Sequence, residues 1–521
     1  MQKVLEKLLT YKVAILFYAY SLVIDNFMKE NIMKNTIIKL VIIVSFLCPI
    51  SAVNFSEDIS QIIYENCTEC HREGEIGGFL PLTNFNEVYD NRNWISAAIS
   101  IPDNYRHGQP MMPPWQPDRE YSNLVGERFL SDSQIQLFLD WIDVGADQGD
   151  SSLEYPMPEF PEGSAIGTPD IVLTMEESTQ IQGNYEDYYR CFVFDLNSDE
   201  DIYYSAIEVR PGNNEAVHHT VIVAVPPGSA DELDAADDQY GYECFGGFGV
   251  TQMTDLLGGY APGTKPNKWN NGLAQKIPAG WDLIAQMHYA PVLEDMEDLT
   301  EINIFTLEND LVEREIQSFT MIDPTIFLPP HQITEVHNTQ YVSGDISVVS
   351  FFPHSHLLGD SWEVYAVSAS NDTIPFIRIN DWDFDWQNYY YPEYMLHVPS
   401  GSTIHAKAVY DNTANNPNNP NNPPEYVWWG DGTTDEMFFL PILYVPYQDG
   451  DEFLPLGEVE SAFGDVNYDG EVNIIDVVLI VNYILGPGNL SDDQIILSDY
   501  NMDGAVDILD IVDIINYILI L

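Results

Sequence analysis

The chain has 521 residues, which is too long for one hydrophobic core, so three or four domains are expected. Its 19 Lys and Arg residues stand against 82 Asp and Glu residues, giving a formal charge of −63. Nucleic acid and anionic lipid repel such a chain, and we exclude nucleic acid as a partner. The acidity suits a calcium-rich or saline exterior, and simple solubility accounts for it equally well.

The first 52 residues contain two apolar stretches, residues 13–24 and 37–50, each shorter than the roughly 20 residues that a membrane span requires. The second stretch follows Lys34 and ends at Ser51-Ala52, which predicts a signal peptide cleaved after Ala52. Residues 1–52 are therefore assigned to a signal peptide region. The mature protein is expected to be secreted, periplasmic or on the cell surface.

A Cys-x-x-Cys-His motif follows at Cys67, Cys70 and His71. In the attachment motif for c-type haem, two thiols form thioether bonds to the vinyl groups and the adjacent His ligates the iron. Half of a zinc site is the alternative interpretation, but no second Cys pair lies within reach. The motif therefore predicts covalently bound haem c.

The sixth iron ligand is expected from the proline-rich loop at residues 109–115, which offers Met111 and Met112. We favour Met112, because the loop resembles bacterial cytochrome c domains in which the ligand Met directly precedes Pro-Pro-Trp. A helix is predicted over residues 56–66, and Ser131 with Gln134 predicts a capping box that opens a second helix. Residues 53–150 are thus predicted to form a small all-α cytochrome c domain.

Residues 151–168 form a Pro- and Glu-rich linker, and beyond it the sequence changes character. Short alternating runs, at residues 201–209, 220–225 and 346–352, are separated by clusters of Gly, Pro and Asn, which is typical of β-sandwiches. Two all-β, jelly-roll-like sandwiches are expected, over residues 169–312 and 313–458. Cys191 and Cys244 are the only thiols left, so counting alone predicts a disulfide inside the first sandwich.

The tandem histidines His218 and His219 lie within an alternating apolar run that predicts a strand. Successive strand side chains point to opposite faces, so both imidazoles can reach one ion only where the strand bends or ends. A third ligand must come from another segment. The best candidate is His288, in the apolar run at residues 283–289.

A second pair of histidines, His354 and His356, has the i, i+2 spacing that places both side chains on one face of a strand. Met437 offers a thioether to accompany them, and the Asn- and Pro-rich tract at residues 412–420 is predicted to be an extended loop ahead of it. Three imidazoles beside two imidazoles and one thioether suit copper better than zinc or calcium, because thioether sulfur favours Cu(I).

In their order along the chain, these six residues resemble the ligands of the copper type II, ascorbate-dependent monooxygenases, the family of peptidylglycine α-hydroxylating and dopamine β-monooxygenases. The resemblance covers roughly residues 165–455 and is more specific than any single His motif. It implies two β-sandwich domains with one copper each. The electron-donating copper would be held by His218, His219 and His288. The catalytic copper, which binds oxygen and substrate, would be held by His354, His356 and Met437.

Peptide-amidating members of that family carry an Arg two positions before the first His of the His-x-His pair and a Tyr four positions after the ligand Met. This chain has Phe352 and Pro441 there, so a C-terminal peptide carboxylate is not expected to bind. The phenylalanines at positions 351, 352, 438 and 439 lie near the predicted ligands, so an apolar substrate is a possible alternative. Strand phenylalanines, however, usually belong to the core.

The tail, residues 462–521, repeats a calcium-loop pattern in which oxygen ligands alternate and a Gly makes the sharp turn. Helices are expected at residues 477–485 and 511–520. The candidate calcium positions are Asp465, Asn467, Asp469, Glu471, Asn473 and Asp476 in the first loop, and Asp499, Asn501, Asp503, Ala505, Asp507 and Asp510 in the second. Asp at position twelve, and no preceding helix, resemble a type I dockerin, which implies two calcium ions and a cohesin-like partner.

The combined resemblance implies a secreted enzyme that hydroxylates a C–H bond of a small organic substrate with O2, using electrons from ascorbate or another donor. We hypothesise that the fused haem relays electrons to the two coppers. Two other functions stay open: a copper and haem electron-transfer protein without a substrate cleft, and an assembly subunit recruited through its dockerin.

Overall fold

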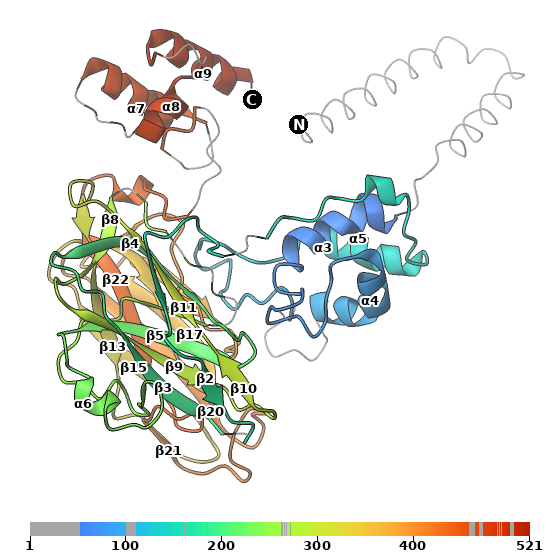
Figure 1. The fold of residues 1–521 in the computed structure, drawn as a ribbon. Helices are drawn as coiled ribbons and strands as arrows, with labels where there is room; N and C mark the ends of the chain where they lie inside the picture. Colours follow the sequence, from blue (N-terminus) through green and yellow to red (C-terminus); the bar gives the residue numbers. More distant parts are fainter. Residues whose placement is uncertain are drawn as a thin grey trace, which may run out of the picture.

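The computed structural model describes residues 53–100, 111–160, 163–184, 186–261, 264, 266, 268–270, 272–457, 464–467, 472–486, 488, 490, 492–500 and 505–520. The predicted signal peptide, residues 1–52, lies outside them. The described residues form an N-terminal helical module, two β-sandwiches and a C-terminal group of helices (Figure 1). None of the helices in these ranges combines the length and the apolarity that a membrane crossing requires.

The N-terminal helical module, residues 53–160, has the elements η1 (Phe55–Ile59, a π-helical turn), α3 (Ser60–Asn66), α4 (Phe85–Ile99), α5 (Asp132–Asp143) and η2 (Ser151–Leu153). Its core forms around the fully buried side chains of Phe55, Phe138 and Trp141. The predicted capping box of α5 is confirmed: the Ser131 hydroxyl accepts a hydrogen bond from the Gln134 backbone N–H, and the Gln134 side chain accepts one from the Ser131 N–H.

A docking segment within this module, residues 115–125, leaves the helices and lies on the second sandwich. The backbone N–H of Asp118 donates to the carbonyl of Arg378 at 2.7 Å, and the N–H of Val125 donates to the carbonyl of Tyr391 at 2.8 Å. A segment from the middle of the helical module's sequence therefore attaches the module to the second sandwich.

The first sandwich consists of two five-stranded sheets. One has the strand order β1 (Ile171–Thr174), β11 (Glu301–Thr306), β4 (Ile202–Arg210), β8 (Leu273–Ile277) and β12 (Arg314–Glu315). The other has the order β6 (Tyr242–Glu243), β3 (Tyr188–Phe194), β9 (Asp282–Tyr289), β5 (Val217–Val225) and β7 (Gly258–Tyr260). A two-stranded ribbon, β2 (Thr179–Ile181) with β10 (Met296–Asp298), and the short helix α6 (Asp231–Asp234) lie outside the two sheets. The predicted strands at residues 201–209 and 220–225 fall within β4 and β5.

The second sandwich consists of two four-stranded sheets. One has the order β13 (Gln317–Ile322), β22 (Phe439–Pro446), β16 (Ile346–Phe351) and β19 (Leu396–Val398). The other has the order β15 (Gln332–Tyr341), β20 (Thr403–Asn412), β17 (Gly359–Val367) and β18 (Thr373–Ile379). The remaining elements are β14 (Phe327–Leu328), β21 (Val427–Trp428) and η3 (Asp451–Phe453). The tract at residues 413–426 contains no strand, as predicted for an extended loop.

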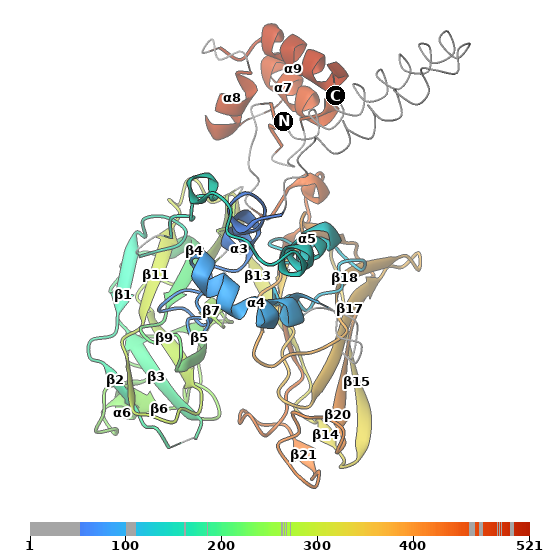
Figure 2. The same cartoon turned by 90° about the vertical axis from the view of Figure 1, so that its right-hand side faces the viewer.

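A buried ion pair joins the two sandwiches at one end. Arg314, on β12 of the first sandwich, donates from Nη1 and Nη2 to the two carboxylate oxygens of Asp451, at 2.6 and 2.8 Å. Asp451 also accepts a hydrogen bond from the hydroxyl of Ser347 on β16. Figure 2 shows the two sandwiches side by side, with the helical module lying across the face where they meet.

The C-terminal group of helices contains α7 (Ile474–Leu485), α8 (Asp492–Ser498) and α9 (Ile508–Ile520). Helix α7 starts three residues earlier than predicted, because Asn473 caps it and forms a reciprocal capping box with Asp476. It ends at Gly486, whose φ of 87° lies in the left-handed region that favours glycine. Helix α8 was not predicted from the sequence.

Candidate metal centre

Three histidines of the first sandwich come together on the neighbouring strands β5 and β9. His219 lies directly opposite His288 in the antiparallel pairing, and the register shifts between Val217 and His219. That shift is the bend that tandem histidines need, because it brings the ring of His218 to the same site. One nitrogen from each of the three residues lies within 4.8 Å of the others.

The nitrogens that converge are the Nδ1 atoms. The Nδ1 of His219 lies 3.4 Å from that of His218 and 3.2 Å from that of His288. His288 is 1% exposed, and its Nε2 donates to the carboxylate of Asp187 at 2.7 Å, which leaves the lone pair on Nδ1. Burial lowers the pKa of His288, although Asp187 opposes this shift, and burial holds the pKa of His219 well below its usual value. Neutral imidazoles with converging lone pairs can hold one metal ion.

The second group of histidines belongs to the other sandwich. After β16 ends at Phe351, the chain keeps its antiparallel pairing with the start of β22, and the N–H of His354 donates to the carbonyl of Phe439 at 2.9 Å. The strand alternation therefore continues, so His354 and His356 share one face and their ring centroids lie 5.1 Å apart.

Each ring of this pair is oriented through its Nδ1. The Nδ1 of His354 hydrogen-bonds the side-chain oxygen of Gln387, and the Nδ1 of His356 lies 3.2 Å from the backbone oxygen of Asp435. Both Nδ1 atoms therefore carry the proton, and both Nε2 atoms are left as electron-pair donors. Burial lowers the pKa of His354 to about 4 and that of His356 to about 3. Met437 lines the same pocket as these rings.

A buried carboxyl group holds the segment that carries these ligands. Glu436 is fully buried, and it accepts hydrogen bonds from the backbone N–H groups of His356, of Leu358 at 3.0 Å and of Met437 at 2.8 Å. Burial raises the pKa of Glu436 to about 8, although hydrogen bonds from the backbone N–H groups act in the opposite direction. One side chain thus fixes both the histidine segment and the methionine.

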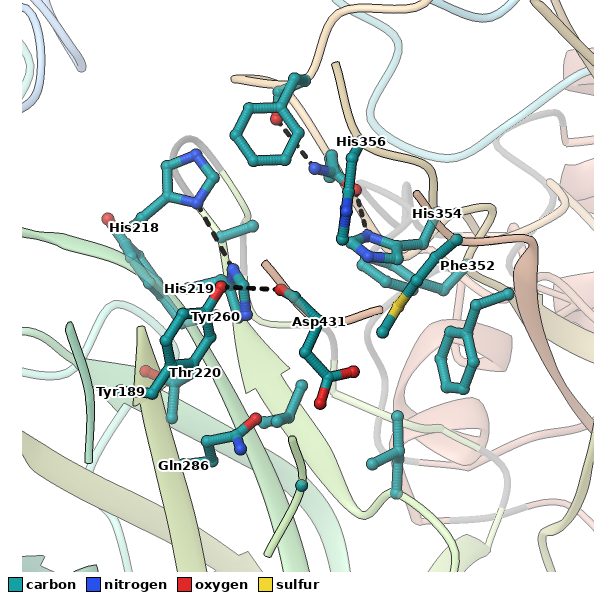
Figure 3. Close-up of a pocket in the computed structure, with 18 of the residues that line it drawn as sticks. Tyr189, His218, His219, Thr220, Tyr260, Gln286, Phe352, His354, His356 and Asp431 are labelled. Atoms are coloured by element: carbon teal, nitrogen blue, oxygen red, sulfur yellow. Dashed lines mark hydrogen bonds between the residues drawn. The ribbon is translucent and has the colours of Figure 1, made fainter. Parts of the chain in front are cut away.

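The two ligand groups open onto one cavity of about 240 Å³. Figure 3 shows His218 and His219 on one side of this pocket and His354 and His356 on the other. Most of the lining is aromatic or aliphatic; it includes Tyr189, Val221, Phe248, Leu256, Tyr260, Phe352, Phe384, Tyr389, Trp429 and Phe439. Asp431 is the one carboxylate among the lining residues described, and no Lys or Arg is among them.

The four phenylalanines near the predicted ligands divide according to strand alternation. Phe351 and Phe438 are fully buried in the core of the second sandwich. Phe352 and Phe439 face the pocket instead. The prediction that strand phenylalanines belong to the core is therefore confirmed for two of these residues, and the other two line the pocket.

Four residues of the site were missed from the sequence: Asp187, Phe384, Gln387 and Glu436. The first three lie in loops far from the histidines along the chain, and nothing in their local sequence marks them. Glu436 did carry a signal, because an acidic residue directly precedes the apolar run at residues 437–443. A carboxyl group that is buried at the start of a strand needs hydrogen-bond donors around it, which predicts a structural role.

The Cys-x-x-Cys-His segment follows the end of α3. Cys67 and Cys70 are not joined in a disulfide, and the Nδ1 of His71 lies 3.0 Å from the carbonyl oxygen of Leu80. Gly77 permits the close packing of this loop, because a Cβ there would lie 2.8 Å from the Nδ1 of His71. Met112 is partly buried and packs against the core of the helical module.

The predicted disulfide is present: Cys191, on β3, is bonded to Cys244, just after β6, and their Cα atoms lie 5.8 Å apart. Of the predicted calcium positions, Asp469, Glu471, Asn501 and Asp503 lie outside the described residues. Asp465, Asp476 and Asp510 are fully buried. The Asp476 carboxylate accepts hydrogen bonds from the N–H groups of Val466 at 2.8 Å and of Asn467 at 3.0 Å, so it closes the first loop.

Comparison with protein families identifies two parts of the chain. Residues 319–452 match the copper type II ascorbate-dependent monooxygenase, C-terminal domain, and residues 463–519 match the dockerin type I domain. The second sandwich is thus a copper monooxygenase C-terminal domain, and the C-terminal helices are a type I dockerin. Neither match covers the helical module or the first sandwich. The predicted cytochrome c assignment of the helical module therefore has no family support. No curated protein matches the chain.

Similar solved structures include PNGF-II in a C2 space group, with 10% identity and a TM-score of 0.23, over 53% of this chain and 65% of that chain. They also include N-glycanase F (PNGase F), with 9% identity and a TM-score of 0.22, over 53% of this chain and 96% of that chain. At these TM-scores, neither likeness carries an argument about fold or function.

Proposed function

We propose that this protein is a secreted, copper-dependent monooxygenase. The reaction takes one C–H bond of an organic substrate, one O2, two electrons and two protons, and gives a hydroxylated product and water. The observation that carries the proposal is the single pocket onto which both ligand groups open. A copper monooxygenase domain supplies one of these groups, and the sandwich that packs beside it supplies the other.

The donor atoms fit copper. In the first group, nitrogens 3.2 and 3.4 Å apart can surround one ion, and the second group adds the thioether that favours reduced copper. His218, His219 and His288 would hold the electron-donating ion, and His354, His356 and Met437 would hold the ion beside the reacting C–H bond. Copper supplies the one-electron chemistry that side chains cannot readily perform.

The chain itself orients the ligands and lines the space between them with apolar side chains. Asp187 fixes the ring of His288 through Nε2, and Gln387 fixes the ring of His354 through Nδ1, so the other nitrogen of each ring is left for an ion. The aromatic lining offers water few hydrogen-bond partners in the space between the two groups, which would protect reactive species from side reactions. Phe352 and Phe439 offer apolar contact to a substrate beside His354.

We further propose that the helical module binds haem c through Cys67, Cys70, His71 and Met112, and that it feeds electrons to the copper ions. Two observations support this: Cys67 and Cys70 form no disulfide, and the Nδ1 of His71 is engaged with the carbonyl of Leu80, which leaves the Nε2 of His71 for iron. The module also lies close to the three-histidine group: the side chain of Asn214 donates to the carbonyl of Gly74 at 3.0 Å.

The dockerin indicates where the proposed enzyme acts and what it binds. Its two loops would bind calcium through the predicted oxygen ligands, and the buried carboxylates of Asp465 and Asp476 are suited to such an ion. Dockerins bind cohesins, so a cohesin-like protein outside the cell is the partner proposed for this tail.

Metal analysis and oxygen uptake test the proposed function. We expect two copper ions and one haem per chain, and oxygen consumption that depends on an added compound from a panel of benzylic, amine and peptidyl substrates. Oxygen uptake that does not depend on any added organic compound would favour an electron-transfer protein. Absence of copper from both groups would leave only an assembly role. Reduced haem that stays reduced when copper and O2 are both present would refute the relay.

A further inference from the structure

The loop between β18 and β19 places one aromatic ring between the two ligand groups. The ring of Phe384 stacks on His218, with centroids 4.8 Å apart and planes inclined by 22°. The same ring meets His356 edge to face, with centroids 6.0 Å apart. Among the described residues, no other ring contacts both groups, because Tyr189 contacts only the first and Phe352 and Phe439 only the second.

The loop that carries Phe384 is fixed from two directions. The side-chain amide of Gln387 donates to the carbonyl of Phe384 at 2.8 Å, while its oxygen bonds the ring of His354. From the docking segment of the helical module, the buried Gln116 amide donates to the carbonyls of Asp383 and Trp386, both at 2.8 Å. The ring position is therefore set by the fold around it.

We propose that Phe384 is the relay through which an electron passes from the three-histidine group to the His354 group, an inference that rests on the proposed function. Each turnover needs two electrons at the reacting oxygen, one from each copper, and ascorbate or another one-electron donor replaces both. The electron from the three-histidine side must cross the pocket. A path through packed atoms carries an electron better than an equal distance of water, and Phe384 closes that gap with two ring contacts.

The test follows both coppers after one exposure to O2 and needs no substrate. The copper-loaded full-length protein is reduced without air and mixed with O2, which takes one electron from each of two Cu(I) ions, and two protons, to give two Cu(II) ions and hydrogen peroxide. Freeze-quench EPR separates the two Cu(II) signals because three nitrogens surround one ion and two surround the other. In the wild type, we expect both signals to appear with one common rate.

In Phe384→Leu, the His354-side signal should keep its rate, and the three-histidine signal should lag by about tenfold, which corresponds to about 1.4 kcal/mol of activation free energy. Superoxide, the one-electron product, should then become trappable. Phe384→Tyr keeps the ring and should restore the common rate. Phe248→Leu is the matched control: it removes a ring that lines the same pocket but stacks on none of the described ligand histidines, and it should keep the common rate.

A second measurement separates a relay from a spacer. The dipolar coupling between the two Cu(II) ions, measured by pulsed EPR on the oxidised protein, should be the same in the wild type and in Phe384→Leu. A changed coupling would overturn the relay, because Phe384 would then set the distance between the groups. A common oxidation rate in Phe384→Leu would also overturn it, while two bound coppers would leave the proposed function standing. A wild type that binds no copper would defeat the function itself.

Discussion

The two ligand groups lie on one pocket but are built by different means. In the first sandwich, the backbone ladder between β5 and β9 places His219 opposite His288. In the second sandwich, His354 and His356 lie beyond the end of β16, and the side chains of Glu436 and Gln387 hold their segment. Ligands on paired strands inherit the rigidity of the sheet, whereas ligands on a loop depend on the polar contacts that support it. The second group should therefore be the easier one to disrupt.

The largest effect is expected where both groups depend on the same contact. Arg314→Met removes one partner of the buried ion pair that joins the sandwiches, so the free energy of unfolding should fall by about 3–5 kcal/mol. Urea unfolding at constant protein concentration measures this loss. Arg210→Met is the matched control, because Arg210 and Glu301 lie 3.8 Å apart and are more than a third exposed, so it should cost about 0–1 kcal/mol. Equal losses in the two variants would contradict the role of the buried pair.

The same ion pair predicts a dependence on pH. Burial would raise the pKa of Asp451, but hydrogen bonds from Arg314 and Ser347 outweigh burial and hold that pKa below its usual value. A carboxyl with a depressed pKa stabilises the fold above its unfolded pKa, about 3.9, and this stabilisation is lost as the pH falls through the folded pKa. The difference in unfolding free energy between wild type and Arg314→Met should be full above about pH 5 and shrink below about pH 4. A difference that stays constant into acid would contradict this assignment.

Glu436→Ala should disrupt the second group and spare the first. It leaves the backbone N–H groups of His356, Leu358 and Met437 without their acceptor, which costs on the order of 3 kcal/mol of unfolding free energy. One copper per chain should be lost, and the remaining EPR signal should be that of three nitrogen ligands. Glu335→Ala, at an exposed position on β15 of the same sandwich, should change stability by less than about 0.5 kcal/mol. Loss of both coppers from Glu436→Ala would show that the groups are not built independently.

Asp187→Asn should weaken the first group without abolishing it. The β5–β9 ladder still places the rings, but the acceptor that fixes the proton on Nε2 of His288 is weakened, so the copper affinity should fall about 10- to 100-fold. Competition titration with a chelator measures the affinity. Asp385→Asn is the matched control, because this exposed carboxylate lies 3.9 Å from the Nε2 of His218 and should have a smaller effect. Equal effects would argue against orientation by Asp187.

The sequence predicted the features that depend on local spacing. The capping box at Ser131, the strand at the tandem histidines and the pairing of Cys191 with Cys244 all follow from residues close in the chain or from counting. Helix α4 was missed although a signal was present: Asn84 accepts a hydrogen bond from the N–H of Glu87, three residues on, as an N-cap does. Its apolar stripe of Phe85, Val88, Ile95 and Ile99 is interrupted by Arg92, which weakens the helical period.

The supports of the ligands could not be predicted, because they depend on contacts between distant segments. Asp187 and His288 are 101 residues apart, and Gln116 and the carbonyl of Asp383 are 267 residues apart. No periodicity links such positions. The local sequence around each of these residues looks like that of an ordinary loop. The docking segment was assigned to the helical module for the same reason, since only the fold reveals that residues 115–125 lie on the second sandwich.

The smallest expected effect tests whether the two groups communicate through their supports. Thr433, in the second sandwich, donates from its hydroxyl to the same Asp187 oxygen that accepts from His288, at 3.0 Å. Thr433→Val removes one hydrogen bond of about 1 kcal/mol, so the copper affinity of the three-histidine group should fall by less than about tenfold, and the His354 group should be unchanged. Thr433→Ser keeps the hydroxyl and is the control. If valine has no effect even though Asp187→Asn does, the first sandwich holds its acid unaided, and the groups share a pocket but no support.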